Sequence, residues 1–183
     1  YKKEGKKVSD VCILYNGSSH NYQQIALVKD ELEACLTSKG VHTETILYHD
    51  VHALKQEAQK EVKGFISKLN QAKSIIVLLS GVNEIYVQSF DRLTKILPKD
   101  LLHEKILLPI LIGENVNSLL KAKYDLKLLA SFLGRPYWLS TLFLLHEYVS
   151  FTGINNANAK SRLKEAVDEL IYKADLSLQT FIK

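Results

Sequence analysis

The 183-residue sequence contains no methionine, only two cysteines and three prolines, and a single tryptophan. Cys12 and Cys35 are not in a CxxC spacing, so we expect no disulfide framework, redox motif or metal site, and the default is buried thiols in a reducing cytoplasm. No apolar run is long enough to span a bilayer, which predicts a cytoplasmic protein without membrane contact. The lack of methionine, an initiator included, leaves open that the chain is part of a longer protein.

Charge is also modest, with a formal net charge of +4. Its densest part is the leader 1–7, YKKEGKK, and no basic stripe interleaved with aromatic residues follows it. Nucleic acid is therefore not an expected partner. The length suits one compact core, so we expect a basic leader over 1–7 and a single domain over 8–183.

Two nearly uninterrupted apolar runs organise the chain, at residues 75–79 and 106–112. Runs this short that are apolar on both faces are typical of central strands in a parallel sheet covered by helices. The turn residues after them, beginning at Ser80 and at Gly113, should meet at the carboxyl ends of neighbouring strands. Ligands bind at that edge in open α/β sheets.

The remaining pattern alternates strands with helices. Strands are predicted over 8–15, 41–48, 74–79, 105–112 and 137–145. Helices are predicted from the Ser18 and Ser19 caps to Gly40, and over 55–72, 85–97, 116–133 and 160–182. The polar segment 153–158 is expected to be a loop. This alternation predicts an α/β, three-layer, doubly wound five-stranded parallel sheet, with the flavodoxin-like order 2-1-3-4-5.

The helix over 116–133 has two apolar faces. One set should cover the sheet: Leu119, Ala122, Leu126, Leu129 and Leu133. The other points away from it: Val116, Leu120, Tyr124, Leu128 and Phe132. This second set is either buried under the C-terminal segment of the same chain or forms a homo-oligomer interface around Leu120, Tyr124 and Leu128. Its steps of four would stay aligned better with a π-bulge near Tyr124.

Several residues give the chain a resemblance to a known family, over about 11–151 and most strongly over 75–133. They are Ile75-Ile76-Val77, Tyr86, Leu93, Leu97-Pro98, Leu107-Leu108-Pro109, Gly113, Leu119-Leu120, and Tyr124 within KYDLKLL. On these residues the chain resembles the NADPH-dependent FMN reductase family, most of all its alkanesulfonate-utilisation branch. The resemblance implies hydride transfer from NAD(P)H to FMN, a dimer or tetramer with a π-helix at Tyr124, and a flavin-dependent monooxygenase as a possible partner.

The resemblance also implies a flavin site in three parts. The phosphate loop is Gly17, Ser18, Ser19, His20 and Gln23. The ring loop is Ser80, Gly81, Val82 and Asn83, and the third part is Gly113, Glu114 and Asn115. His20 stands where the family has Arg, Gln23 roughly where it has Ser, Leu79-Ser80-Gly81-Val82 where it has Thr-Pro-x-Tyr, and Glu114 where it has a second Gly.

Two functional hypotheses follow. In the first, the protein is an NAD(P)H-dependent FMN reductase, whose hydride transfer between stacked rings needs no catalytic side chain. In the second, a flavodoxin-like domain with an altered flavin site is a non-catalytic oligomerisation or partner-binding module. In the second case residues 17–20 form an ordinary strand-to-helix turn, and Glu114 complements a helix dipole.

Overall fold

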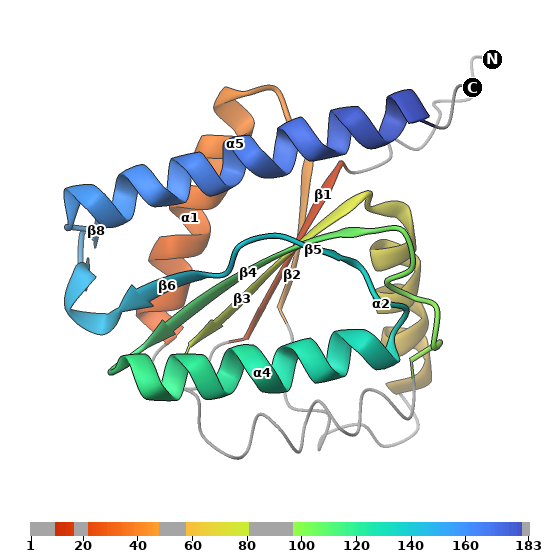
Figure 1. Ribbon diagram of the computed structural model, residues 1–183, viewed down its shortest axis with the longest axis horizontal. Coiled ribbons are helices and arrows are strands. Elements are labelled where there is room, and N and C mark those ends of the chain that lie inside the picture. Colours follow the sequence, from red (N-terminus) through yellow and green to blue (C-terminus); the bar gives the residue numbers. More distant parts are fainter. Residues whose placement is uncertain (1–9, 17–21, 48–57, 81–96, 181–183) are drawn as a thin grey trace.

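A parallel sheet forms the centre of the molecule (Figure 1). The computed structural model describes residues 10–16, 22–47, 58–80 and 97–180. Within them the sheet contains β1 (Val11–Asn16), β2 (Thr43–Leu47), β3 (Ser74–Ser80), β4 (Ile106–Gly113), β5 (Tyr137–Trp138) and β6 (Leu142–Leu145). The order is β2-β1-β3-β4-β5, with β6 also paired to β4, and every pair is parallel. The predicted fold class and strand order are confirmed.

Helices cover both faces of this sheet (Figure 1). Helices α1 (Tyr22–Ser38) and α5 (Ala157–Thr180) pack on one face, and α2 (Ala58–Gln71) and α4 (Val116–Phe132) on the other. Each face has its own apolar cluster, so the three predicted layers are present. The helix predicted over 85–97 lies outside the described residues, apart from Leu97. None of the helices in the described ranges is long and apolar enough to cross a lipid bilayer.

The two central strands are the most buried part of the described chain. Every residue of β3 and β4 is buried, as their continuous apolar runs predicted. Burying one Leu or Ile side chain contributes roughly 1.5–3 kcal/mol, so these strands supply much of the hydrophobic stabilisation. By contrast, β2 is half-buried along its whole length, which agrees with its predicted place at the edge.

The fifth strand, predicted to be continuous over 137–145, is broken. Leu107 pairs with Trp138 and Ile110 with Leu142, so three steps along β4 match four steps along the edge. The extra residue is a bulge opposite Pro109. The N–H groups of Tyr137 and Leu139 donate to the carbonyls of Lys105 and Leu107, which places Pro109 next in the same row. Because proline has no N–H, the ladder is interrupted there.

The segment after β6 is more ordered than the predicted polar loop. A 3-10 turn, η2 (His146–Tyr148), leads into an antiparallel hairpin of β7 (Val149–Ser150) and β8 (Gly153–Ile154). The backbone N–H of Ala159 donates to Oδ1 of Asn156 at 2.9 Å. This side-chain cap explains why α5 begins at Ala157 instead of near Lys160.

Helix α4 carries the two predicted apolar faces, but it contains no π-bulge. It is α-helical from Val116 to Phe132, so the expected π-helix at Tyr124 is wrong. The sheet-facing set is buried. The second set is exposed, and the described part of α5 lies on the opposite face of the sheet (Figure 1). Coverage of this second set by the described part of the C-terminal segment is therefore also wrong.

Candidate functional site

The carboxyl ends of four strands form the edge where a ligand was expected. Asn16, the last residue of β1, pairs with Leu79, and Ser80 follows at the end of β3. Ser80 pairs in turn with Ile112, and Gly113 with Leu145. The chain leaves β1 toward β2 on one side and β3 lies on the other, so the strand order reverses between β1 and β3. A switch point of this kind opens a crevice for ligands.

Ser80 is a polar residue at this switch point. It is 1% exposed, and its Oγ has no hydrogen-bond partner among the described residues. Ile76 and Leu78 share its side of the strand and belong to the core under α1 and α5, so Ser80 lies on that face. A buried hydroxyl without a partner costs about 1–3 kcal/mol, and a ligand atom or an internal water would remove this penalty.

The residues at the end of β4 have structural roles in the described chain. A Cβ at Gly113 would lie 2.8 Å from Leu119 Cδ2, so glycine is needed there to pack α4 closely against the strand. Asn115 is the N-cap of α4, and its Oδ1 accepts a hydrogen bond from the N–H of Ser118 at 2.9 Å. Glu114 is exposed. A carboxylate just before a helix N-terminus is favourable with respect to the helix dipole.

The phosphate part of the predicted site is only partly visible. Helix α1 begins at Tyr22, and Gln23 is exposed in its first turn, beside the carboxyl end of β1. Gly17, Ser18, Ser19 and His20, like Gly81, Val82 and Asn83 of the ring loop, lie outside the described residues. Burial, and then the neighbouring Tyr22, raise the pKa of Tyr15 near the end of β1.

Two polar residues at the same end of the molecule were not predicted. Gln24 Nε2 donates to the carbonyl of Val149 at 3.3 Å, which ties α1 to the hairpin. Gln24 Oε1 and His146 Nε2 are both buried without a hydrogen-bond partner among the described residues. His146 directly follows β6, so the rule that selected Ser80 and Gly113, a polar or turn residue after an apolar strand, would have found it too.

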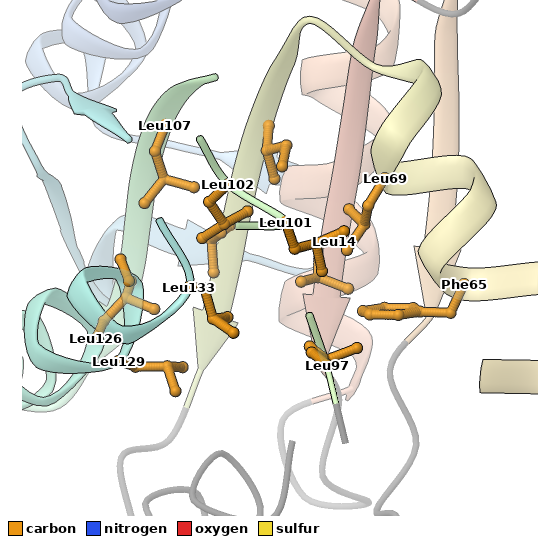
Figure 2. Close-up of a pocket in the computed structure, with 13 residues that line it drawn as sticks. Leu14, Phe65, Leu69, Leu97, Leu101, Leu102, Leu107, Leu126, Leu129 and Leu133 are labelled. Atoms are coloured by element: carbon orange, nitrogen blue, oxygen red, sulfur yellow. The ribbon is translucent and has the colours of Figure 1, made fainter. Parts of the chain in front are cut away.

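Two pockets lie away from this edge. The first, of about 40 Å³, is lined by side chains that are all apolar among the described residues, from β1, β3, β4, α2, α4 with its C-cap Leu133, and residues 97–102 (Figure 2). In Figure 2 the labelled Leu14, Phe65, Leu97 and Leu129 converge around it. Since no described lining residue carries a polar side chain, nothing in the described chain marks this pocket as a ligand site. The second is a surface groove of about 260 Å³ between α1 and α5, near Cys35 and Lys160.

The predicted interface residues lie on the outer face of α4. Tyr124 is 70% exposed, Leu128 61% and Leu120 38%. These side chains are available to a partner, and the homo-oligomer interface stays a prediction.

No protein-family profile matches the chain, and no curated protein does. Solved structures do match it. An NADH:FMN oxidoreductase in its apo form aligns with a TM-score of 0.67 at 19% identity, over 88% of both chains. The fold is flavodoxin-like. An oxidoreductase from Corynebacterium diphtheriae aligns at 0.65 with 17% identity over 94% of this chain and 99% of its own.

A flavodoxin from Streptococcus pneumoniae is also similar, with a TM-score of 0.59 and 15% identity over 89% of this chain and 98% of its own. At such low identities these likenesses establish the flavodoxin-like fold and not the reaction. The alkanesulfonate-utilisation branch stays a prediction, and the α-helical backbone at Tyr124 lacks the feature that the resemblance implied for it.

Proposed function

We propose that this flavodoxin-like chain binds FMN at the carboxyl edge of its sheet and is an NAD(P)H-dependent FMN oxidoreductase. The observation that carries the proposal is the buried, unpartnered hydroxyl of Ser80 at the switch point between β1 and β3. Support also comes from the structural neighbours, one of which is named an NADH:FMN oxidoreductase. Residues 17–20 and 81–83, with Gln23, would complete the site according to the family resemblance.

The described residues fit such a group at Ser80, whose hydroxyl would gain the partner it lacks. FMN, when bound, supplies a ring nitrogen that accepts the hydride of NAD(P)H. The chain has only to hold and orient the two ring systems, so the reaction requires no catalytic acid or nucleophile from it. Glu114 places an exposed carboxylate at the end of β4, and negative charge there disfavours an anionic reduced flavin.

Titration of the protein with FMN, followed by flavin fluorescence quenching and the visible spectrum, tests the proposal. We expect saturable binding at micromolar or tighter affinity, about −8 kcal/mol or better. Loss of one hydrogen bond in Ser80→Ala should weaken binding about three- to tenfold. If FMN binds, we expect the protein also to oxidise NADH or NADPH in the presence of FMN, which a second assay measures.

Ser74→Ala is the matched control. Ser74 is equally buried and also lacks a hydrogen-bond partner for its hydroxyl among the described residues, but it lies at the opposite end of the same strand. It should leave FMN affinity unchanged. No saturable binding at high micromolar FMN would exclude the reductase function, whereas binding that Ser80→Ala leaves unaltered would remove Ser80 from the site and keep the function.

The second candidate function is an oligomerisation or partner-binding module. It is supported by the exposed apolar row on α4, which is unusual for a helix of a free monomer. A colourless protein that still associates through α4 would favour this function.

A further inference from the structure

The exposed face of α4 combines large apolar side chains with positive charge alone. Its exposed residues are Val116, Asn117, Leu120, Lys121, Tyr124, Lys127, Leu128, Ser131 and Phe132. No acidic residue is among them. We propose that this face binds an acidic amphipathic helix of a partner protein, one whose own apolar row is flanked by Glu or Asp. The inference rests on the second candidate function, partner binding, and is independent of flavin binding.

The spacing of the apolar residues indicates a helical partner. Val116, Leu120, Tyr124, Leu128 and Phe132 are four residues apart and are 54%, 38%, 70%, 61% and 61% exposed. Residues at this spacing form one continuous ridge, inclined by about 26° to the helix axis. Such a ridge packs into the matching groove of another helix at a crossing angle near −50°. An apolar row that runs through the middle of a helix, with Tyr124 at its centre, therefore fits the side of a second helix.

The exposed lysines beside the ridge have no carboxylate partner within the described chain. Lys121 has no ion pair within the described chain, and Lys127 has none either. The ammonium group of Lys127 lies 6.0 Å from the ring centroid of Trp138, and that of Lys123 lies 5.9 Å from Phe143. These cation–π contacts restrain the two lysines beside the ridge, which lowers the entropic cost of pairing with a carboxylate.

The same charges disfavour a second copy of this chain as the occupant. The acidic residue within α4, Asp125, is half-buried, and its Oδ2 is inaccessible to solvent. Two α4 helices packed through their exposed faces would bring the Lys121 and Lys127 pairs together, and the one carboxylate within the helix, that of Asp125, is half-buried. Like charges across an interface are costly, whereas a partner with Glu or Asp beside its apolar row converts them into attraction.

Two labelled synthetic helical peptides test the proposal by fluorescence anisotropy. Both carry Leu at every fourth position, and they differ only in flanking residues, Glu in one and Lys in the other. We expect the Glu peptide to bind at least about tenfold more tightly than the Lys peptide, and to weaken as salt rises. The double variant Lys121→Glu with Lys127→Glu should reverse the preference.

Tyr124→Ser should weaken binding of the Glu peptide by about tenfold or more, because it removes the centre of the ridge. Tyr172→Ser, which removes an aromatic side chain of similar exposure from α5, is the control and should have no effect. Sedimentation of the wild-type protein alone should give a monomer. Both tyrosines are exposed, so neither substitution should unfold the protein. Circular dichroism of the variants distinguishes a loss of binding from unfolding.

Three results would overturn the proposal. A salt-insensitive dimer that Tyr124→Ser dissociates would make a second copy the occupant; α4 would remain an interface, but the acidic partner would be excluded. A monomer that binds both peptides equally would exclude charge selection. A monomer that binds neither peptide would contradict both the acidic partner and the partner-binding function.

Discussion

At the scale of single residues, the position of a polar group in the sheet decides whether it is a candidate for ligand binding. Ser74 and Ser80 have the same burial and the same chemistry, but only Ser80 lies where ligands bind in this fold. Lys105 is satisfied within the chain, because its Nζ donates to the carbonyls of Asn70 and Ala72, at 3.2 and 2.7 Å, at the C-terminal end of α2. Burial lowers the pKa of Lys105, because removal from water disfavours the charged ammonium group.

Cys12 gives a prediction about pH. Burial, and then the charge of Glu44, raise the pKa of its thiol from 9.0 to about 12. Below pH 9.0, the pKa of the thiol in the unfolded state, the thiol is neutral in both the folded and the unfolded state, and its contribution to stability is fully present. Between 9.0 and about 12 only the unfolded state releases the proton, and stability is lost as pH rises.

From about pH 8 to about pH 10.5, the unfolding free energy of the wild type should therefore fall by about 2 kcal/mol more than that of Cys12→Ala. Urea unfolding of both proteins at the two pH values measures this difference. Comparing the two proteins removes the contribution of other groups that titrate in the same range. Parallel pH dependence of the two proteins would contradict the buried, neutral thiol.

At the scale of elements, the packing of α4 against β4 sets the geometry at the end of the sheet. Leu119 occupies the space above Gly113, and Asn115 fixes the start of the helix. At the other end, Gly134 has a φ of +121°, and a Cβ there would lie 2.7 Å from the backbone N of His103. A glycine thus lies near each end of α4 where a Cβ would be too close to a neighbour, the Leu119 side chain at Gly113 and the His103 backbone at Gly134.

Two glycine substitutions with opposite expected signs test this packing. Gly113→Ala places a methyl group 2.8 Å from the fully buried Leu119, which cannot shift freely, so it should lower the unfolding free energy by about 1–3 kcal/mol. Gly64→Ala, within α2, meets no atom within 4 Å and should raise stability by about 0.5–1 kcal/mol. Urea unfolding measures both, and a neutral Gly113→Ala would refute the steric account.

At the scale of the whole molecule, the two apolar clusters share one sheet. Residues of β1, β3 and β4 contribute alternately to the cluster under α1 and α5 and to the cluster under α2 and α4. Loss of one cluster would expose one face of these strands and so would destabilise the strands that the other cluster needs. The two faces should therefore unfold together.

We predict one cooperative transition for the chain, as expected for the single domain over 8–183. Trp138, the single tryptophan of the sequence, reports on the α2 and α4 side of the sheet, and far-UV circular dichroism reports on all the helices. Their urea midpoints should coincide. A fluorescence midpoint that clearly differs from the circular dichroism midpoint would indicate separately unfolding parts.

Part of the candidate site was predictable from the sequence. Ser80 and Gly113 were selected because turn residues follow the apolar strands, and the structure places both at the carboxyl edge. The packing role of Gly113 was not predictable, because Leu119 reaches it only after α4 folds back onto β4. The hydrogen bond from Gln24 to Val149 joins residues 125 positions apart, so no local pattern could reveal it.

The sequence by itself determined the fold class and the two apolar faces of α4, because these follow from local periodicity and from the burial that uninterrupted apolar runs require. Strand order is not readable from periodicity, and the order 2-1-3-4-5 was predicted from the usual arrangement of flavodoxin-like sheets. Only the tertiary structure decided the rest. Pro109 breaks the edge strand because its missing N–H happens to face that strand, and the outer face of α4 stays exposed because α5 packs on the opposite side of the sheet. Both depend on which neighbour each element meets, and that is a property of the assembled chain.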